Sequence, residues 1–145
     1  MDNNKIILLV EDNEDDEILT IRALKNNNVR NEIVVCRNGE EALDFLFGTG
    51  NYDGRDSKLL PQVVLLDLNL PGIGGLQVLE KIRASNTTKF LPVIVLTSSK
   101  EERDVIISYR LGVNSFIRKP VDFEQFIAAV KQLSLYWLIL NVTPD

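Results

Sequence analysis

Histidine is absent from the 145 residues, and cysteine occurs only once, at Cys36. The lack of histidine excludes zinc sites built on imidazole, Ser-His-Asp triads and imidazole acid–base chemistry. A single cysteine excludes an intramolecular disulfide and any thiolate cluster. Together with the lack of a signal-peptide pattern, it favours a reducing cytoplasm. The chemistry is therefore left to carboxylates, hydroxyls, Lys and Arg, with or without a bound ion.

Positive charge and long hydrophobic runs are also scarce. The chain carries 16 Lys and Arg against 21 Asp and Glu, a formal net charge of −5. Binding to nucleic-acid phosphates, which needs clustered positive charge, is therefore disfavoured. The longest unbroken apolar run, 135–140, is far shorter than the about 20 residues that a membrane-spanning helix needs. We expect a protein that binds neither nucleic acid nor membrane.

Short runs rich in Val, Ile and Leu alternate with amphipathic stretches along the chain. Such runs are typical of strands buried on both faces, and they predict strands at 5–10, 32–36, 62–66, 92–96 and 115–118. Helices are predicted at 14–25, 39–47, 75–84, 101–111 and from Pro120 to about 140, and the polar segment 48–61 is expected to be a mobile loop. This alternation predicts right-handed crossovers, hence a five-stranded parallel α/β sheet with helices on both faces.

Polar side chains follow four of the predicted strands. Glu11 and Asp12 follow the first strand, Asp67 the third, Thr97 the fourth and Lys119 the fifth. Because ligand sites of such sheets lie at the carboxyl ends of the strands, we expect these groups to converge. Crowded carboxylates repel one another, and a hard divalent cation such as Mg²⁺ relieves that repulsion. An aspartate beside Mg²⁺ and a lysine can attack a phosphorus centre and form an acyl phosphate.

The acidic run 14–17 is interpreted differently. It lies in the first turn of a helix that Asn13 can cap, where negative side chains stabilise the helix dipole. Glu11 and Asp12 precede the cap, so the dipole does not explain them. Cys36, at the end of the second strand, is expected to be an inert buried thiol.

In these motifs the chain resembles a response-regulator receiver domain of two-component signalling. The matching residues, in the family's order, are Glu11-Asp12, Asp67 in LLDLNLPGIGG, Thr97 in VLTSS and Lys119-Pro120 in FIRKP. The resemblance covers residues 5 to about 132. It implies a doubly wound, flavodoxin-like sheet with strand order 2-1-3-4-5 and a phosphorylation-activated signalling switch. Such a switch is not an enzyme in the usual sense, because it catalyses only its own phosphoryl transfer and dephosphorylation.

The resemblance also implies a role for each residue of the set. Asp67 would accept a phosphoryl group from a sensor histidine kinase, and Thr97 and Lys119 would contact that group. Phe116 occupies the family's aromatic switch position, and a cis peptide bond is expected before Pro120. The ligands of Mg²⁺ would be the carboxylates of Glu11, Asp12 and Asp67 and the backbone carbonyl of Asn69.

The segment 48–61 and the aromatic C-terminal stretch narrow the resemblance to stand-alone regulators of cyanobacterial phytochromes. A phytochrome kinase is therefore a candidate partner. We expect residues 1–145 to form a single receiver domain, with 133–145 as an apolar C-terminal helix extension. Apolar residues fall on several faces of that helix, so we expect a homodimer through Tyr136, Trp137 and Leu138. The alternative is that the tail folds back onto its own domain.

Two other functions can be weighed against the switch. A Mg²⁺-dependent phosphohydrolase that uses an aspartyl phosphate would carry a second Asp two residues after the nucleophile. This chain has Asn69 there, and a carboxamide cannot shuttle a proton. A flavin-binding domain would need a hydroxyl- or glycine-rich loop after the first strand, and the acidic segment 11–16 would repel the FMN phosphate.

Overall fold

The computed structural model describes residues 6–26, 29–97, 110–113 and 115–132. Five parallel strands form one sheet in the order β2-β1-β3-β4-β5. The strands are β1 (Ile6–Val10), β2 (Glu32–Cys36), β3 (Val63–Asp67), β4 (Val93–Thr97) and β5 (Ser115–Arg118). This order confirms the doubly wound, flavodoxin-like topology predicted from the sequence.

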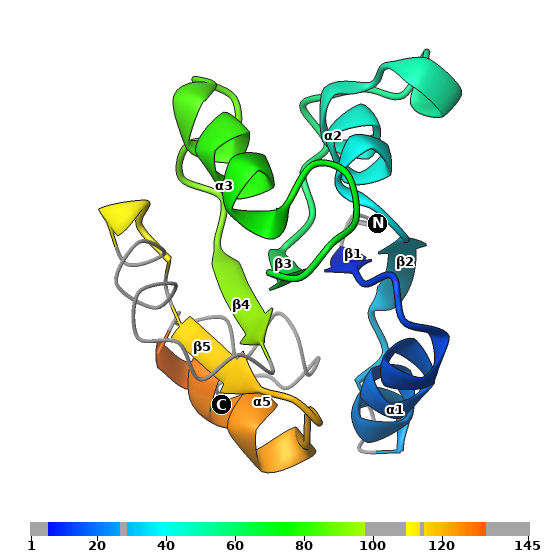
Figure 1. Ribbon diagram of the computed structural model, residues 1–145, viewed down its shortest axis with the longest axis vertical. Coiled ribbons are helices and arrows are strands. Elements are labelled where there is room, and N and C mark those ends of the chain that lie inside the picture. The colour runs from blue at the N-terminus through cyan, green and yellow to red at the C-terminus, as the bar shows by residue number, and fades with distance from the viewer. Residues whose placement is uncertain (1–5, 27–28, 98–109, 114, 133–145) are drawn as a thin grey trace, which may run out of the picture.

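Helices cover both faces of the sheet (Figure 1). They are α1 (Glu14–Lys25), α2 (Gly39–Phe47), α3 (Gly75–Ala84) and α5 (Phe123–Gln132), with a short 3-10 helix, η1 (Gly50–Tyr52), after α2. α2 and α3 lie on one face, and α1 and α5 lie on the other (Figure 1). The predicted helix at 101–111 lies almost wholly outside the described residues, and so does the predicted extension at 133–145. No helix among the described residues is both long and apolar enough to cross a membrane.

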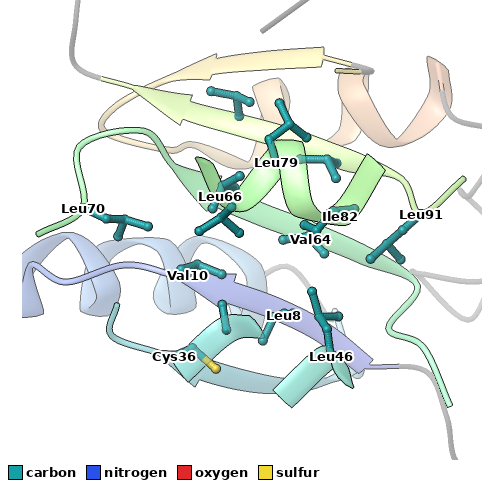
Figure 2. Close-up of a cluster of buried hydrophobic side chains, with 14 of the residues drawn as sticks. Leu8, Val10, Cys36, Leu46, Val64, Leu66, Leu70, Leu79, Ile82 and Leu91 are labelled. Carbon is teal, nitrogen blue, oxygen red and sulfur yellow. The ribbon is translucent and has the colours of Figure 1, made fainter. Parts of the chain in front are cut away.

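Successive strand residues feed two separate hydrophobic clusters, one on each face of the sheet. Leu8 and Val10 of β1 point to the α2–α3 face, where they pack with Cys36, Leu46 and the residues labelled in Figure 2. Ile7 and Leu9 point the opposite way, into a cluster that includes Leu24 of α1 and Phe126 of α5. Side chains alternate between the faces of a strand, so burial on both faces explains the near-continuous apolar runs.

The capping and turn residues place the helices as the sequence indicates. The side chain of Asn13 accepts a hydrogen bond from the Asp16 backbone N–H at 2.9 Å, which confirms it as the N-cap of α1. Asn38 caps α2 in the same way, accepting from the Glu41 N–H at 2.8 Å. β3 and β4 each begin and end one residue later than predicted, and the first residue of the predicted strand at 5–10 lies outside the described residues.

The segment 48–61 contains a structure that the sequence prediction missed. The Tyr52 ring packs edge-on against the Phe45 ring at a centroid distance of 5.1 Å. The Arg55 guanidinium lies over the same Phe45 ring at 3.8 Å and donates a hydrogen bond to the Phe45 carbonyl at 2.8 Å. These two side chains hold the otherwise polar segment 48–61, called the insertion below, against α2. The 3-10 helix η1 forms between α2 and Arg55.

Arg83 of α3 connects this helix to two other segments, the one before β4 and the one before β5. Its Nε donates to the Leu111 carbonyl at 2.9 Å and its Nη2 to the Gly112 carbonyl at 2.8 Å. Its Nη1 donates to the carbonyl of Leu91, just before β4, at 2.8 Å. A planar guanidinium can satisfy several carbonyls at once because its donors are fixed in a fork. Arg83 therefore fixes the approach to β5 against α3.

Candidate functional site

The acidic residues that follow β1 and end β3 meet at the carboxyl end of the sheet. Glu11, Asp12 and Asp67 each offer a carboxylate oxygen, and these oxygens lie within 4.8 Å of one another. Glu11 and Asp67 are buried, whereas Asp12 is exposed. β1 and β3 are neighbours in the sheet, so residues that leave their ends necessarily lie close together. The predicted acidic cluster is therefore present.

Lys119, which follows β5, brings a positive charge to this cluster. Its Nζ lies 2.7 Å from Glu11 Oε1, 2.9 Å from Asp67 Oδ2 and 3.1 Å from Asp16 Oδ2. Burial opposes the ammonium charge, but the carboxylates of Asp67 and Glu11 outweigh it and raise the pKa of Lys119. The peptide bond between Lys119 and Pro120 is cis, as expected. Lys119 is therefore a fixed cation among carboxylates.

Glu11 is the most deeply buried acid of the cluster, with a fully buried side chain. Burial raises the pKa of Glu11 to about 7, Lys119 opposes that rise, and the Asp67 carboxylate adds to it. Its Oε2 accepts a hydrogen bond from the Asn13 backbone N–H at 3.2 Å. Its Oε1 faces the Lys119 ammonium but lacks an aligned hydrogen-bond partner among the described residues. Glu11 thus holds a carboxylate oxygen whose bonding capacity is incompletely used.

Asp67 is held from both sides at the end of β3. Its Oδ1 accepts the Asn69 backbone N–H at 3.0 Å, and its Oδ2 accepts from Lys119. α3 begins directly beside it, since a Cβ added at Gly75 would lie 2.4 Å from the Asp67 carbonyl oxygen. Only glycine allows that approach without a shift of the backbone. The start of α3 therefore fixes the backbone around Asp67.

The donors of this site suit a hard divalent cation. All of the clustered ligand atoms are carboxylate oxygens, the type that Mg²⁺ and Mn²⁺ prefer. Three carboxylates meet the single ammonium of Lys119 here, and this excess of negative charge is the observation that fits a bound cation. Exposed Asp12 leaves one side of the cluster accessible to solvent and to ligand waters.

The other residues that the sequence singles out stand as follows. Thr97 ends β4, and β4 lies between β3 and β5, but its side chain is outside what the structure describes. Phe116 of β5 is half-buried and packs against the hydrophobic cluster on the α2–α3 face of the sheet. Asn69 is exposed in the loop after β3. Tyr136, Trp137 and Leu138, proposed for a dimer, lie outside the described residues.

Asp16 is a member of the site that the sequence interpretation missed. It was assigned with its acidic neighbours to the dipole of α1, yet its carboxylate contacts Lys119. Asp16 lies in the first turn of α1, four residues after Asp12, and its place among other acidic residues hid its contact with Lys119. The dipole interpretation remains adequate for Glu14 and Asp15, which are exposed.

Comparison with known proteins identifies relatives of this chain. The response regulator receiver domain family matches residues 7–131. The response regulator Rcp1 of Synechocystis sp. is 38% identical over 134 residues, which are 92% of this chain and 89% of Rcp1. The bacteriophytochrome response regulator AtBRR is 50% identical with a TM-score of 0.84, covering 92% of this chain and 94% of its own. The phosphorylated cyanobacterial phytochrome response regulator RcpA is 40% identical with a TM-score of 0.76, covering 97% and 99%. Rcp1 has also been solved in a Mn²⁺-bound form.

Proposed function

The chain belongs to the response regulator receiver family, and we propose that Asp67 is the residue of this chain that accepts the phosphoryl group. Members of this family are signalling switches that are phosphorylated on an aspartate by histidine kinases, and this chain is such a switch. The observation that supports Asp67 is its position. It is the cluster carboxylate at the end of the central strand β3, hydrogen-bonded to Lys119 at 2.9 Å and bordered by α3 through Gly75.

The proposed reaction transfers a phosphoryl group between two side chains. A carboxylate oxygen of Asp67 attacks phosphorus, a P–O bond forms, and the bond from phosphorus to the donor nitrogen breaks. Lys119 provides a positive charge near the phosphoryl oxygens, where charge accumulates in the transition state. Glu11 and Asp12, with Asp67 and the Asn69 carbonyl, would hold Mg²⁺, which supplies further positive charge when bound. Thr97 would donate its hydroxyl to a phosphoryl oxygen.

Intact mass after incubation with acetyl phosphate and Mg²⁺ tests the assignment. We expect the wild-type chain to gain the mass of one phosphoryl group and Asp67→Asn to gain none. Asp53→Asn, which removes an exposed carboxylate from the insertion, is the matched control and should be labelled like the wild type. Equal labelling of Asp67→Asn would show that another residue is the acceptor.

We propose that Thr97 and Phe116 convert phosphorylation into a change of surface. A phosphoryl group on Asp67 would draw Thr97 towards it, and the space released would admit the Phe116 ring. The adjacent positions of β3, β4 and β5 in the sheet support this route. Thr97→Ala should still be phosphorylated, but the NMR shifts around Phe116 should respond less than in the wild type. An unchanged response in Thr97→Ala would contradict the coupling.

We propose a phytochrome-type sensor histidine kinase as the phosphodonor, acting in the cytoplasm. The relatives AtBRR and RcpA, which are regulators of phytochromes by name, support the kinase class. The free thiol of Cys36 supports a reducing compartment. The alternative of a phosphohydrolase has no support from these relatives, which are response regulators. An assay for hydrolysis of a generic phosphate ester should accordingly give no turnover.

We further propose a homodimer through the C-terminal helix region, with Tyr136, Trp137 and Leu138 in the contact. Sequence supports it, because apolar residues there exceed what one buried face requires. The described part of α5 supports it as well, since Phe123, Glu124, Ile127 and Ala128 border a surface hollow of about 300 Å³.

Sedimentation at several concentrations tests the dimer. The wild type should associate by about tens of micromolar, the range of transient pairs. Tyr136→Glu/Leu138→Glu should remain monomeric. Leu59→Glu, the same kind of change at an exposed position of the insertion, should leave association intact. A wild type that stays monomeric throughout this range would overturn the dimer.

A further inference from the structure

Asp16 contacts the phosphorylation site from outside its acidic cluster. Its Oδ2 lies 3.1 Å from Lys119 Nζ and accepts a hydrogen bond from it. Two bonds fix Asp16 relative to Glu11, because the Asn13 N–H donates to Glu11 Oε2 and the Asn13 side chain accepts from the Asp16 N–H. The first turn of α1 is therefore connected to the site both through the backbone of the 11–16 loop and through the Lys119 ammonium.

Lys119 Nζ donates hydrogen bonds to Asp16 Oδ2 and Asp67 Oδ2, and its third close neighbour is Glu11 Oε1 at 2.7 Å. When Asp67 is phosphorylated, a phosphoryl oxygen that binds this ammonium competes with the two remaining carboxylates, those of Glu11 and Asp16. The exposed fractions of the three side chains differ greatly, at 0% for Glu11, 2% for Asp67 and 32% for Asp16. Release of a carboxylate is least costly where water can replace the lost partner, so of Glu11 and Asp16 we expect Asp16 to be displaced.

We propose that Asp16 is a positioning residue for Lys119, which holds the ammonium in the unphosphorylated site and loses that contact when Asp67 is phosphorylated. This inference rests on the proposed role of Asp67. Loss of the contact changes the first turn of α1, which lies on the α1–α5 face of the sheet. Phe116 packs on the opposite face. Phosphorylation is thus communicated to both faces of the sheet, by Lys119 and Asp16 on one and by Thr97 and Phe116 on the other.

Phosphorylation kinetics give the first test, with acetyl phosphate as the donor. Asp16→Asn should react about two- to fivefold faster than Asp15→Asn, the factor expected if one solvent-accessible ion pair no longer has to be broken. Asp15 is an exposed residue of the same helical turn, so its variant controls for the lost negative charge and for the helix dipole. Asp16→Glu, which keeps the carboxylate, should return the rate towards that of the wild type.

Spectroscopy gives the second test, which requires neither metal nor phosphorylation. In the metal-free protein, the ¹⁵N resonance of the Lys119 ammonium should shift in Asp16→Asn and remain in place in Asp15→Asn. Addition of beryllium fluoride with Mg²⁺, which mimics a phosphoryl group on a carboxylate, should move the amide resonances of residues 14–17 in the wild type. The same addition should move them much less in Asp16→Asn.

The outcomes separate this inference from the role of Asp67. If the wild type is phosphorylated on Asp67 but Asp16→Asn and Asp15→Asn react at the same rate with the same Lys119 resonance, Asp16 does not position Lys119. If the wild type is not phosphorylated on Asp67, the proposed function itself fails. In that case the metal-free Lys119 resonance still reports whether Asp16 holds the ammonium.

Discussion

At the scale of single residues, the burial of Glu11 has a consequence for stability. Because burial raises the pKa of Glu11 to about 7 from an ordinary 4.5, the folded protein binds a proton that the unfolded chain releases. The resulting stabilisation is complete below the unfolded pKa and is lost as the pH rises through the folded pKa. This shift corresponds to about 3 kcal/mol as an upper bound.

We therefore expect the metal-free protein to lose stability as the pH rises from about 4.5 to above about 7. Glu11→Gln, which cannot ionise, should have a flatter profile in this window. Urea unfolding of metal-free protein at a series of pH values measures the effect. Glu14→Gln, a change at an exposed position, is the control and should follow the wild type. Parallel profiles for Glu11→Gln and the wild type would contradict the assignment of this proton to Glu11.

The sequence predicted the chemically central residues but not all of their contacts. Each of the residues Glu11, Asp67 and Lys119 directly follows a predicted strand. The topology of a parallel sheet then brings the ends of these strands to the same edge. Asp16 could not be placed in the same way, because acidic residues in a first helical turn have an adequate local explanation. Its role depends on how far the Lys119 side chain reaches across the sheet edge, and no spacing rule encodes that reach.

At the scale of elements, the insertion that contains η1 covers part of the core. Tyr52 packs against the hydrophobic cluster that contains Cys36, and its hydroxyl donates to Glu41 Oε2 at 3.2 Å. Burial raises the pKa of the Cys36 thiol to about 12, so the thiol is protonated at neutral pH and reacts slowly with alkylating reagents. Cys36 can therefore report on how well the insertion covers the core.

We expect iodoacetamide to leave Cys36 unmodified in the native wild type and to modify it after denaturation. Tyr52→Ala should react faster under native conditions, because loss of the ring opens a path to the thiol. Tyr52→Phe keeps the ring and should remain protected, which separates packing from the hydrogen bond to Glu41. Intact mass over time gives the rates. Equal protection of Tyr52→Ala and the wild type would show that the insertion does not shield Cys36.

The order within this insertion was not predictable from its composition. The segment 48–61 is polar and rich in glycine, a composition typical of a loop. Its structure depends on Tyr52 and Arg55 reaching the same ring of Phe45, and that contact comes from tertiary packing. Isolated aromatic and arginine residues in a polar segment are a weak signal, because many such residues are solvent-exposed.

Arg83 connects α3 to neighbouring segments, and we expect Arg83→Lys to destabilise the fold. A lysine presents its donors from one point and cannot reach the carbonyls of Leu91, Leu111 and Gly112 together. The expected loss is about 1.5–3 kcal/mol in the free energy of unfolding, the range for hydrogen bonds to charged groups. Urea denaturation measures it. Arg22→Lys, at an exposed position of α1, should be near neutral, and an equally neutral Arg83→Lys would contradict the role of Arg83.

At the scale of the whole molecule, the sheet separates two hydrophobic clusters that share no side chains. Leu46 of α2 belongs to one cluster and Ile94 of β4 to the other. We expect Leu46→Ala to cost about 2–5 kcal/mol and Ile94→Val about 0.5–1.5 kcal/mol. The double variant should show the sum of the two within about 0.5 kcal/mol, as for independent sites. A larger deviation in chemical denaturation would show that the sheet transmits packing changes between its faces.

The architecture as a whole was predictable because two sequence patterns alternate regularly along the chain: continuous apolar runs for strands and helically spaced apolar residues for helices. Apolar runs such as that of β3 (Val63–Asp67) mark buried strands, and the helices between them carry apolar residues at helical spacing. The one-residue differences at the ends of β3 and β4 have a simple cause. Asp67 and Thr97 are polar residues that still pair with the neighbouring strand, so a prediction based on hydrophobicity ends too early.

The separation of the site residues along the chain also governs the order of events during protein synthesis. Asp16 and Lys119 are 103 positions apart, and Asp67 and Lys119 are 52 apart. A chain leaving the ribosome has its acidic residues long before the lysine that balances them. Until β5 emerges and pairs with β4, the carboxylates repel one another without a counter-charge. If Lys119 acts as proposed, we expect a nascent chain to become competent for phosphorylation only once β5 has paired with β4.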